Sequence, residues 1–277
     1  MIYELQPAEG CRLIRHLLEG CEHAVVIYGV LEGNNLGKIY VDDPKAPTAA
    51  FIWAQNEMFY LIGAPSEAFI SQLEGFIIER IKPEAIGIGE DYFNLELITE
   101  EPSDTLVERI FRNRLSRGER VPFSFQKEAF LALEAWLALP GEYELLSVDR
   151  NAMERDAQNK IEREILKFWD TTETFLAKGI GFCIFKGNEV IGTCLSVFVS
   201  GSEYEIGINT YETLHRGKGL ATAMAAAFIH QCIQKGGTPH WTTESFRKDS
   251  IAIAGKLGFK QLPNYPVYFL AFEDFKQ

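Results

Sequence analysis

The residues best suited to chemistry form the run Arg216-Gly217-Lys218-Gly219-Leu220-Ala221-Thr222. Its two glycines let the backbone pass close to a ligand, and free N–H groups at the start of a helix point toward an anion. Arg216 and Lys218 add positive charge at the same place. We therefore expect this run to bind the phosphates of a cofactor, whereas a surface turn with incidental glycines is the plainer alternative.

Two other glycine-loop motifs fail on spacing. A P-loop needs a glycine five residues before its Gly-Lys pair and a Ser or Thr directly after it, but Glu212 and Gly219 hold those positions. A dinucleotide fingerprint that begins at Gly217 and Gly219 needs a third small residue where Thr222 stands. The sequence also has no acidic residue about twenty positions later on a second expected strand.

The elements on either side of the run fit a strand, a loop and a helix. Residues 204–209 alternate polar and apolar side chains, which predicts a half-buried strand. Residues 220–235 are rich in Ala, Leu, Met, Phe and Ile, and Gly236 and Gly237 follow as a stop signal.

These residues resemble the GNAT superfamily of N-acetyltransferases, whose pyrophosphate loop has the pattern that Arg216, Gly219 and Ala221 match. A second match is the helix ending in Lys256-Leu257-Gly258-Phe259. A narrower resemblance, to the branch that includes the zwittermicin A resistance acetyltransferases, rests on a further set of residues. They are Phe168-Trp169, Phe175-Leu176, Gly179-Ile180-Gly181-Phe182-Cys183 and the loop itself.

The resemblance implies direct acyl transfer from acetyl-CoA to an amine, with no metal. It implies that the loop backbone holds the pyrophosphate, and that an N–H group at the end of the preceding strand polarises the thioester carbonyl. The second group corresponds here to Ile208, Asn209 and Thr210. Arg247 replaces the family's asparagine and is expected to meet the ribose phosphate, with Ser250 as a further cofactor-binding residue.

Glu205 is the candidate base, because a carboxylate on the strand beside the cofactor can take a proton from the amine. A solvent-facing residue on an alternating strand is the alternative, and Glu244 is a rival base. The family's usual proton donor to the thiolate is a tyrosine, but Ala254 stands at that position. Tyr265 and Tyr268 are candidate substitutes, although core packing is the preferred interpretation of each.

Other conspicuous side chains are assigned structural roles. His215 is expected to have a capping or solvent role, and neither His230 nor His240 has an acid at metal-ligand spacing. Trp169 and Trp241 are expected in the core.

Composition places the chain among globular proteins of two ordinary domains, with 277 residues, 47% hydrophobic content and 24% charged residues. A formal net charge of -12 argues against a nucleic-acid partner. Five cysteines without C-x-x-C spacing indicate buried thiols rather than a disulfide or zinc framework. The start of the chain does not resemble a signal peptide, and no apolar run is long enough to span a membrane, so we expect a cytoplasmic protein.

The first half is expected to be an α+β unit without a motif. The expected helices cover 10–19 and, capped by Ser66, 66–80, and the expected strands cover 24–30, 38–41, 49–54, 58–62 and 94–98. Arg117-Gly118-Glu119-Arg120 is expected to be an exposed turn, and 126–139 a connecting helix.

The second half is expected to begin with a strand over 143–148 and a helical region over 149–167 that Asp149 caps. Further strands are expected over 181–185, 190–199, 241–244 and 267–272, with a turn over 186–189 and a short helix that ends at Lys256. This order is that of the family's core.

The fold class is therefore α+β, with a C-terminal GNAT-like acetyltransferase domain over 131–277, built as a mixed, mostly antiparallel sheet flanked by helices. An N-terminal accessory α+β domain over 1–130 would be a lid, a substrate wall, a dimer surface or a decayed copy of the same fold. The expected activity is acetyl-CoA-dependent N-acetylation of a primary amine on a small molecule such as an antibiotic, because an acidic cleft would suit a small cation. A non-catalytic acetyl-CoA-binding or regulatory protein is the alternative, and oligomeric state is left open.

Overall fold

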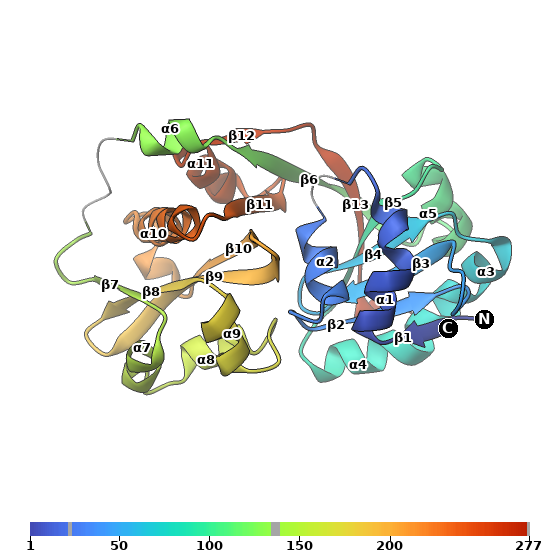
Figure 1. Cartoon of the computed structure of the whole chain (residues 1–277), viewed down its shortest axis with the longest axis horizontal. Helices are drawn as coiled ribbons and strands as arrows, with labels where there is room; N and C mark the ends of the chain where they lie inside the picture. Colours follow the sequence, from blue (N-terminus) through green and yellow to red (C-terminus); the bar gives the residue numbers. More distant parts are fainter. Residues whose placement is uncertain (22–23, 134–138, 276–277) are drawn as a thin grey trace. The chain divides into compact units, whose positions relative to one another are not determined.

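A computed structural model describes the chain except for residues 22–23, 134–138 and 276–277. Its contacts divide the chain into two compact units. The first comprises Met1–Arg120 together with Asn264–Gln277, and the second comprises Val121–Pro263. Figure 1 colours the elements of each unit along the sequence.

The first unit is built on a mixed sheet. Strands β1 to β4 pair antiparallel in order, β4 pairs parallel with β5, and β13 lies between β5 and the first half of β6. The strands are β1 (Tyr3–Leu5), β2 (Gly37–Val41), β3 (Ala49–Ala54), β4 (Met58–Gly63), β5 (Tyr92–Ile98), β6 (Ser116–Phe125) and β13 (Tyr265–Ala271). The last strand of the chain therefore completes the sheet of the first unit.

Helices cover both faces of this sheet (Figure 1). One face carries α1 (Pro7–Ile14), the 3₁₀ turn η1 (Arg15–Leu18) and α2 (Val25–Leu31). The other carries α3 (Glu67–Phe76), the π turn η2 (Ile77–Ile81), α4 (Lys82–Gly87) and α5 (Ser103–Phe111), and η4 (Phe272–Asp274) follows β13. Because both faces are covered, every residue of β3 is buried, which a half-exposed strand would not allow.

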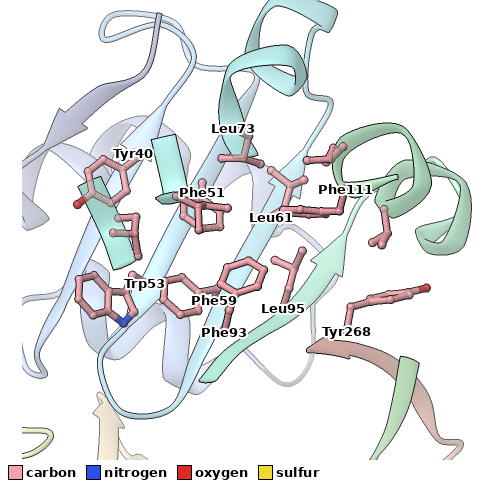
Figure 2. Packing of buried hydrophobic residues seen from close by; sticks show 14 of the residues in the cluster. Tyr40, Phe51, Trp53, Phe59, Leu61, Leu73, Phe93, Leu95, Phe111 and Tyr268 are labelled. Carbon is pink, nitrogen blue, oxygen red and sulfur yellow. The ribbon is translucent and has the colours of Figure 1, made fainter. Parts of the chain in front are cut away.

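The core on the α3 and α5 face is rich in aromatic rings (Figure 2). Phe51 stacks on Phe59 at 5.6 Å between ring centroids, and Phe59 lies 4.8 Å from Phe93. Tyr268 from the C-terminal strand belongs to the same cluster, with 3% of its surface exposed. Residues from both ends of the chain thus share one core.

Two expectations for the first half are wrong. Residues 24–30 were expected to form a strand, but Val25–Leu31 is the helix α2, because a short apolar run fits a buried helix as well as a buried strand. The residues Arg117 to Arg120 are not an exposed turn: they lie inside β6, and Arg120 is 6% exposed between Glu57 and Glu96 at 3.2 and 3.3 Å. The other helices and strands expected there are confirmed within a few residues, and Ser66 does cap α3.

The second unit is built on antiparallel strands with one parallel addition. Strands β7, β8, β9 and β10 pair antiparallel in order, and β11 pairs parallel with β10. The strands are β7 (Glu144–Ser147), β8 (Gly181–Lys186), β9 (Glu189–Ser200), β10 (Glu203–Thr210), β11 (Thr238–Glu244) and β12 (Phe259–Gln261). β12 pairs with the end of β6, residues Phe123 to Phe125.

One long helix, α10 (Leu220–Gln234), packs against β8, β9 and β10. The other helical segments are α6 (Lys127–Leu131), α7 (Arg150–Arg155), α8 (Lys160–Ile165), α9 (Thr172–Lys178), α11 (Lys248–Lys256) and the 3₁₀ turn η3 (Thr213–His215). Trp169 is 1% exposed and donates its indole N–H to the Ser196 carbonyl at 2.9 Å, so its expected core role is confirmed. Of the connecting helix expected over 126–139, only Lys127–Leu131 is observed, as α6; residues 134–138 lie outside the described residues.

Candidate functional site

The predicted phosphate loop joins β10 to α10 through two left-handed glycines. Gly217 has φ +74° and Gly219 has φ +79°, a region that residues with a Cβ rarely adopt. Arg216 between η3 and these glycines is extended, with φ -72° and ψ 160°. The glycines therefore make the turn that brings the chain into the first residue of α10.

The start of α10 keeps its backbone donors available. The first backbone bond into the helix runs from the Ala223 N–H to the Gly219 carbonyl at 3.0 Å. No side chain caps this end, and its first turn contains no acidic residue. Within the described part of the chain, the N–H groups of Leu220, Ala221 and Thr222 have no acceptor, and together with the helix dipole they favour an anion.

The parallel strands β10 and β11 pair over only part of their length. Their register joins Glu203 with Thr238, Tyr204 with Pro239 and Glu205 with His240, and the described pairs end there. Both strands continue, to Thr210 and Glu244 respectively. On its other side β10 stays paired with β9 as far as Thr210. The later half of β10, which includes residues 208–210, therefore has a backbone edge that β11 does not occupy.

Glu205 lies at the point where the two strands separate. The register of β9 and β10 shifts between Glu205 and Ile206, which marks a bulge at the same place. Glu205 is 6% exposed, so the alternative of a solvent-facing carboxylate is wrong. On the neighbouring strand, Nε2 of His240 lies 2.5 Å from a carboxylate oxygen of Glu203. The site thus gathers two carboxylates and an imidazole around the end of the strand pairing.

The rival base Glu244 ends β11 and is half-buried, with its carboxylate 3.8 Å from the Arg247 guanidinium. Arg247 directly precedes α11 as its N-cap residue. Ser250 on α11 is 6% exposed and accepts a hydrogen bond from the Trp241 indole at 3.1 Å. Ala254, which stands where the family has its tyrosine, is fully buried in the same helix.

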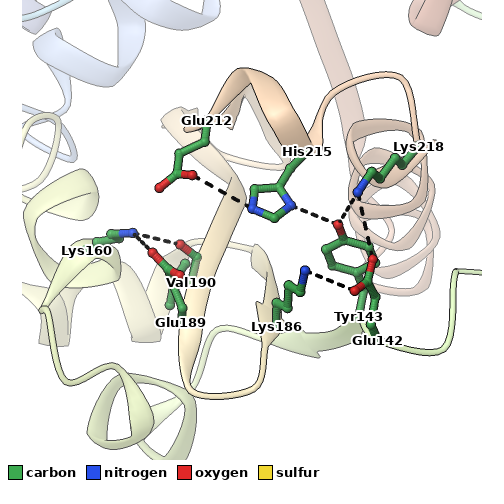
Figure 3. Close-up of polar contacts among 9 residues, drawn as sticks. All are labelled: Glu142, Tyr143, Lys160, Lys186, Glu189, Val190, Glu212, His215 and Lys218. Atoms are coloured by element: carbon green, nitrogen blue, oxygen red, sulfur yellow. Dashed lines mark hydrogen bonds and ion pairs between the residues drawn. The ribbon is translucent and has the colours of Figure 1, made fainter.

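A buried phenol connects the two sides of the loop (Figure 3). The Tyr143 hydroxyl lies 2.8 Å from Nζ of Lys218 and 2.8 Å from Nδ1 of His215. A lysine only donates, so the phenol oxygen accepts from Lys218 and its own O–H is available to Nδ1. Nε2 of His215 then faces Glu212 at 3.9 Å.

His215 is 4% exposed, so the capping or solvent role expected for it is wrong. Sequence spacing gave no signal for this contact, because Tyr143 lies more than seventy residues earlier in the chain. Arg216, by contrast, is exposed, and its guanidinium lies 3.5 Å from the Thr210 carbonyl at the end of β10. The loop is thus fixed on one side by a buried contact and open on the other.

The two candidate tyrosines belong to the first unit and have partners there. Tyr265 donates its hydroxyl to Glu96 at 3.1 Å, and Tyr268 donates to Asp104 at 2.5 Å. Burial, together with the Glu96 carboxylate, raises the pKa of Tyr265, and burial with the Asp104 contacts raises that of Tyr268 to about 12. Both hydroxyls therefore stay protonated at neutral pH.

The first unit also has a parallel strand pair followed by a helix, but its strand edge and its helix start both differ from those of the second unit. Its strands β4 and β5 pair in parallel from Phe59 and Leu95 to Ile62 and Ile98, which is the end of β5. The following helix α3 is capped, because the Ser66 hydroxyl accepts the Phe69 N–H at 3.3 Å. Glu67 in its first turn adds negative charge. Neither the open strand edge nor the free helix start of the second unit is repeated there.

The five cysteines are free thiols, of which Cys183, Cys194 and Cys232 are buried. Within the described ranges, no three His, Cys, Asp or Glu side chains are grouped so as to hold a metal ion. Among the described helices, none combines the length and the apolar character needed to cross a bilayer.

Comparison with known proteins gives consistent matches along most of the chain. A family model described as GNAT acetyltransferase matches residues 15–268. A protein of Bacillus subtilis (strain 168) named uncharacterized N-acetyltransferase YdfB is 29% identical over 245 residues, 88% of this chain and 89% of that protein.

Solved structures share the fold over nearly the whole length. A GCN5-related N-acetyltransferase-like protein from Streptococcus suis 89/1591 is 23% identical with a TM-score of 0.67, covering 95% of this chain and 99% of its own. A tandem GNAT protein from the clavulanic acid biosynthesis pathway is 10% identical with a TM-score of 0.58, covering 98% and 99% of the two chains.

Proposed function

The chain belongs to the GNAT acetyltransferase family and is an N-acetyltransferase by that membership, and we propose that it transfers an acetyl group from acetyl-CoA to a primary amine of a small molecule. The observation that carries the proposal is the open edge of β10 after Glu205, next to a helix start with free N–H groups. An extended ligand arm can pair with such an edge while its phosphates bind the helix start.

The cofactor would bind along this edge. The N–H groups from Arg216 to Thr222 would hold the pyrophosphate, with the charge of Arg216 beside it and that of Lys218 to the side of the loop. A backbone N–H among residues 208–210 would donate to the thioester oxygen. Arg247 would approach the ribose of the cofactor. Ser250 would contribute through the position of α11, because its hydroxyl is already occupied by Trp241.

The reaction would begin with removal of a proton from the ammonium form of the substrate, for which Glu205 is the proposed base. The amine nitrogen then attacks the thioester carbon, a C–N bond forms and the C–S bond breaks. The thiolate takes one proton and the amide is released. Tyr265 and Tyr268 remain candidate donors from the sequence, but their hydrogen bonds to Glu96 and Asp104 give them another role.

The proposed acceptor is an antibiotic or a similar amine. The resemblance to the zwittermicin A resistance branch supports it, and so does the net charge of -12, which favours a cationic partner over an anionic one. One solved structure with a similar fold comes from the clavulanic acid biosynthesis pathway, which is compatible with a small acceptor.

We further propose that the two units, Met1–Arg120 with Asn264–Gln277 and Val121–Pro263, are copies of one fold of which only the second keeps a cofactor site. In each unit an antiparallel meander of three strands is followed by a helix and then by a strand parallel to the last one. The tandem GNAT protein with a similar fold supports this division.

Calorimetric titration with acetyl-CoA tests the function. We expect micromolar binding by the wild type and none by Gly219→Glu, which adds a charge and a Cβ where φ is +79°. Gly236→Glu is the matched control, because Gly236 has φ +74° at the other end of α10 with open space around it. No binding by the wild type, or full binding by Gly219→Glu, contradicts the cofactor site.

A protein that binds acetyl-CoA without turnover is the second candidate, favoured by the buried Ala254 in place of the family's tyrosine. Release of free coenzyme A in the presence of a panel of amines separates the two, because only an enzyme consumes the thioester.

A further inference from the structure

Two lysines from different parts of the second unit converge on the buried Tyr143 (Figure 3). Nζ of Lys218 lies 5.3 Å from the centre of the Tyr143 ring, and Nζ of Lys186 lies 5.7 Å from it. Lys218 precedes α10, whereas Lys186 ends β8. No sequence pattern connects Lys186 with the loop, because Lys186 stands in a hairpin turn.

Sheet register explains why the two lysines meet. The hairpin that joins β8 and β9 pairs Lys186 with Glu189, and a few residues later Gly192 of β9 pairs with Thr210 at the end of β10. The last residues of β8 and of β10 therefore lie at the same end of the sheet. The loop leaves β10 at this end and enters α10, so Lys186 reaches the side of the loop.

The ammonium groups are held in place but remain accessible. Glu142 lies 3.0 Å from Lys186 and 3.8 Å from Lys218, and the Tyr143 hydroxyl accepts from Lys218. The lysine side chains are 40% and 36% exposed, respectively, while Tyr143 beneath them is 6% exposed. Each ammonium has three N–H donors, and the contacts with Tyr143 and Glu142 use only some of them.

The charge of this cluster is opposite to that of the chain. The protein carries a formal net charge of -12, which opposes the approach of a polyanion, yet two ammonium groups here share one carboxylate. The hydrogen bond from Lys186 keeps the pKa of Glu142 below its usual value, so the carboxylate is ionised and the cluster retains one net positive charge. Such a cluster suits a doubly charged phosphate better than a singly charged one.

We propose that Lys186 and Lys218, oriented by Tyr143 and Glu142, form a subsite for a phosphate monoester, the 3′-phosphate on the ribose of coenzyme A. The inference rests on the proposed function and adds to it a discrimination between 3′-phosphorylated and dephosphorylated cofactor. The loop backbone is the proposed binder of the pyrophosphate, whereas the two ammonium groups lie at Tyr143 to the side of the loop, so we assign them the other phosphate. A phosphate monoester carries close to two negative charges at neutral pH and accepts several hydrogen bonds.

Calorimetric titration with two ligands tests the subsite. Acetyl-CoA and acetyl-3′-dephospho-CoA share the pyrophosphate and the acyl arm and differ only in the monoester. We expect the wild type to bind acetyl-CoA about tenfold or more tightly than the dephospho ligand, as charge-assisted hydrogen bonds allow. Lys186→Gln and Lys218→Gln should each weaken the binding of acetyl-CoA about fivefold to tenfold. The affinity for the dephospho ligand should change less than about twofold.

Two further variants set the controls. Glu142→Gln removes the competing carboxylate and should tighten acetyl-CoA binding while leaving the dephospho ligand unchanged. Lys167→Gln removes an equal charge from a lysine paired with Glu164 on α8 and should not change the preference.

Equal affinity of the wild type for both ligands, or equal weakening of both by the lysine variants, overturns the subsite while the proposed function stands. Binding of neither ligand by the wild type overturns the proposed function, and the subsite with it.

Discussion

Glu205 and His240 face each other in the last register pair that β10 and β11 form. Beyond this pair the described residues of β10 and β11 do not pair with each other, so the Glu205 carboxylate lies where these two strands separate. A base at such a point has access to the open edge and is still shielded from bulk solvent, with 6% exposure. The pair therefore marks the place where we expect proton transfer.

Glu205→Gln should lower kcat about a hundredfold, because the amide cannot take a proton from the amine. The Kd for acetyl-CoA should change less than about twofold, since Glu205 is not among the groups proposed to hold the cofactor. Steady-state release of coenzyme A and calorimetry measure the two quantities. Glu173→Gln, at an exposed carboxylate on α9, is the control, and we expect it to keep most of the turnover. A Glu205→Gln enzyme with normal kcat would remove Glu205 from the mechanism.

Tyr143→Phe should lower the free energy of unfolding by about 1–2 kcal/mol, because it leaves the buried His215 without its partner while the ring still packs. It should also weaken acetyl-CoA binding by releasing Lys218 from its position. Urea unfolding and calorimetry measure both effects. Tyr92→Phe, at a residue with 53% exposure, is the control. Identical urea midpoints for the two variants would mean that the Tyr143 hydroxyl contributes nothing.

The stability of the first unit should depend on pH through Glu90. Burial raises the pKa of this carboxyl from 4.5 to about 7, although the Trp53 indole and the Asn56 N–H both donate to it. The folded state thus holds the proton more tightly than the unfolded chain. The resulting stabilisation is complete below the unfolded pKa and is lost as pH rises through the folded pKa.

The free energy of unfolding should therefore fall by up to about 3 kcal/mol as the pH rises from near 4.5 to about 7. Glu90→Gln keeps an acceptor oxygen for Trp53 and should flatten this dependence. Urea unfolding at about pH 5.5 and about pH 8, followed by tryptophan fluorescence, compares the two proteins. Parallel changes in both would show that other groups cause the pH dependence.

Ser66→Ala should destabilise the protein by about 1 kcal/mol through loss of the α3 cap, and Ser66→Gly by only a few tenths. Neither change should affect acetyl-CoA affinity, since the start of α3 is closed by Ser66 and by the negative charge of Glu67. Urea unfolding and calorimetry on the same samples measure both. A loss of acetyl-CoA affinity in Ser66→Ala would give the first unit a part in cofactor binding.

The sequence predicted the second unit well because its signals are local. The alternation over 204–209 predicted β10, and the stop signal at Gly236 predicted the end of α10. Both features depend mainly on residues that are neighbours in the sequence. The two left-handed glycines of the loop follow from the same local chemistry. The assignments of catalytic and cofactor-binding roles to individual side chains stay predictions.

The sequence failed where the outcome depends on distant residues. Val25–Leu31 is apolar throughout, so only packing against the sheet of the first unit decides that it is a helix. Arg120 looked exposed because its neighbours are charged, but Glu57 and Glu96 pair with it across strands. The contacts of His215 and Lys186 with Tyr143 could not be predicted from sequence spacing, because the register between strands brings these residues together.

The place of β13 between β5 and β6 has a consequence for how the protein is made. A ribosome that has released residues 1–120 has not yet synthesised the strand that separates these two, nor Phe272 and Phe275 of the same core. Until β13 is synthesised, β5 and β6 of the nascent first unit each expose an unpaired edge. Such edges are sites for chaperone binding or for misassembly between neighbouring chains. An expression fragment that stops near residue 120 would remain in that state.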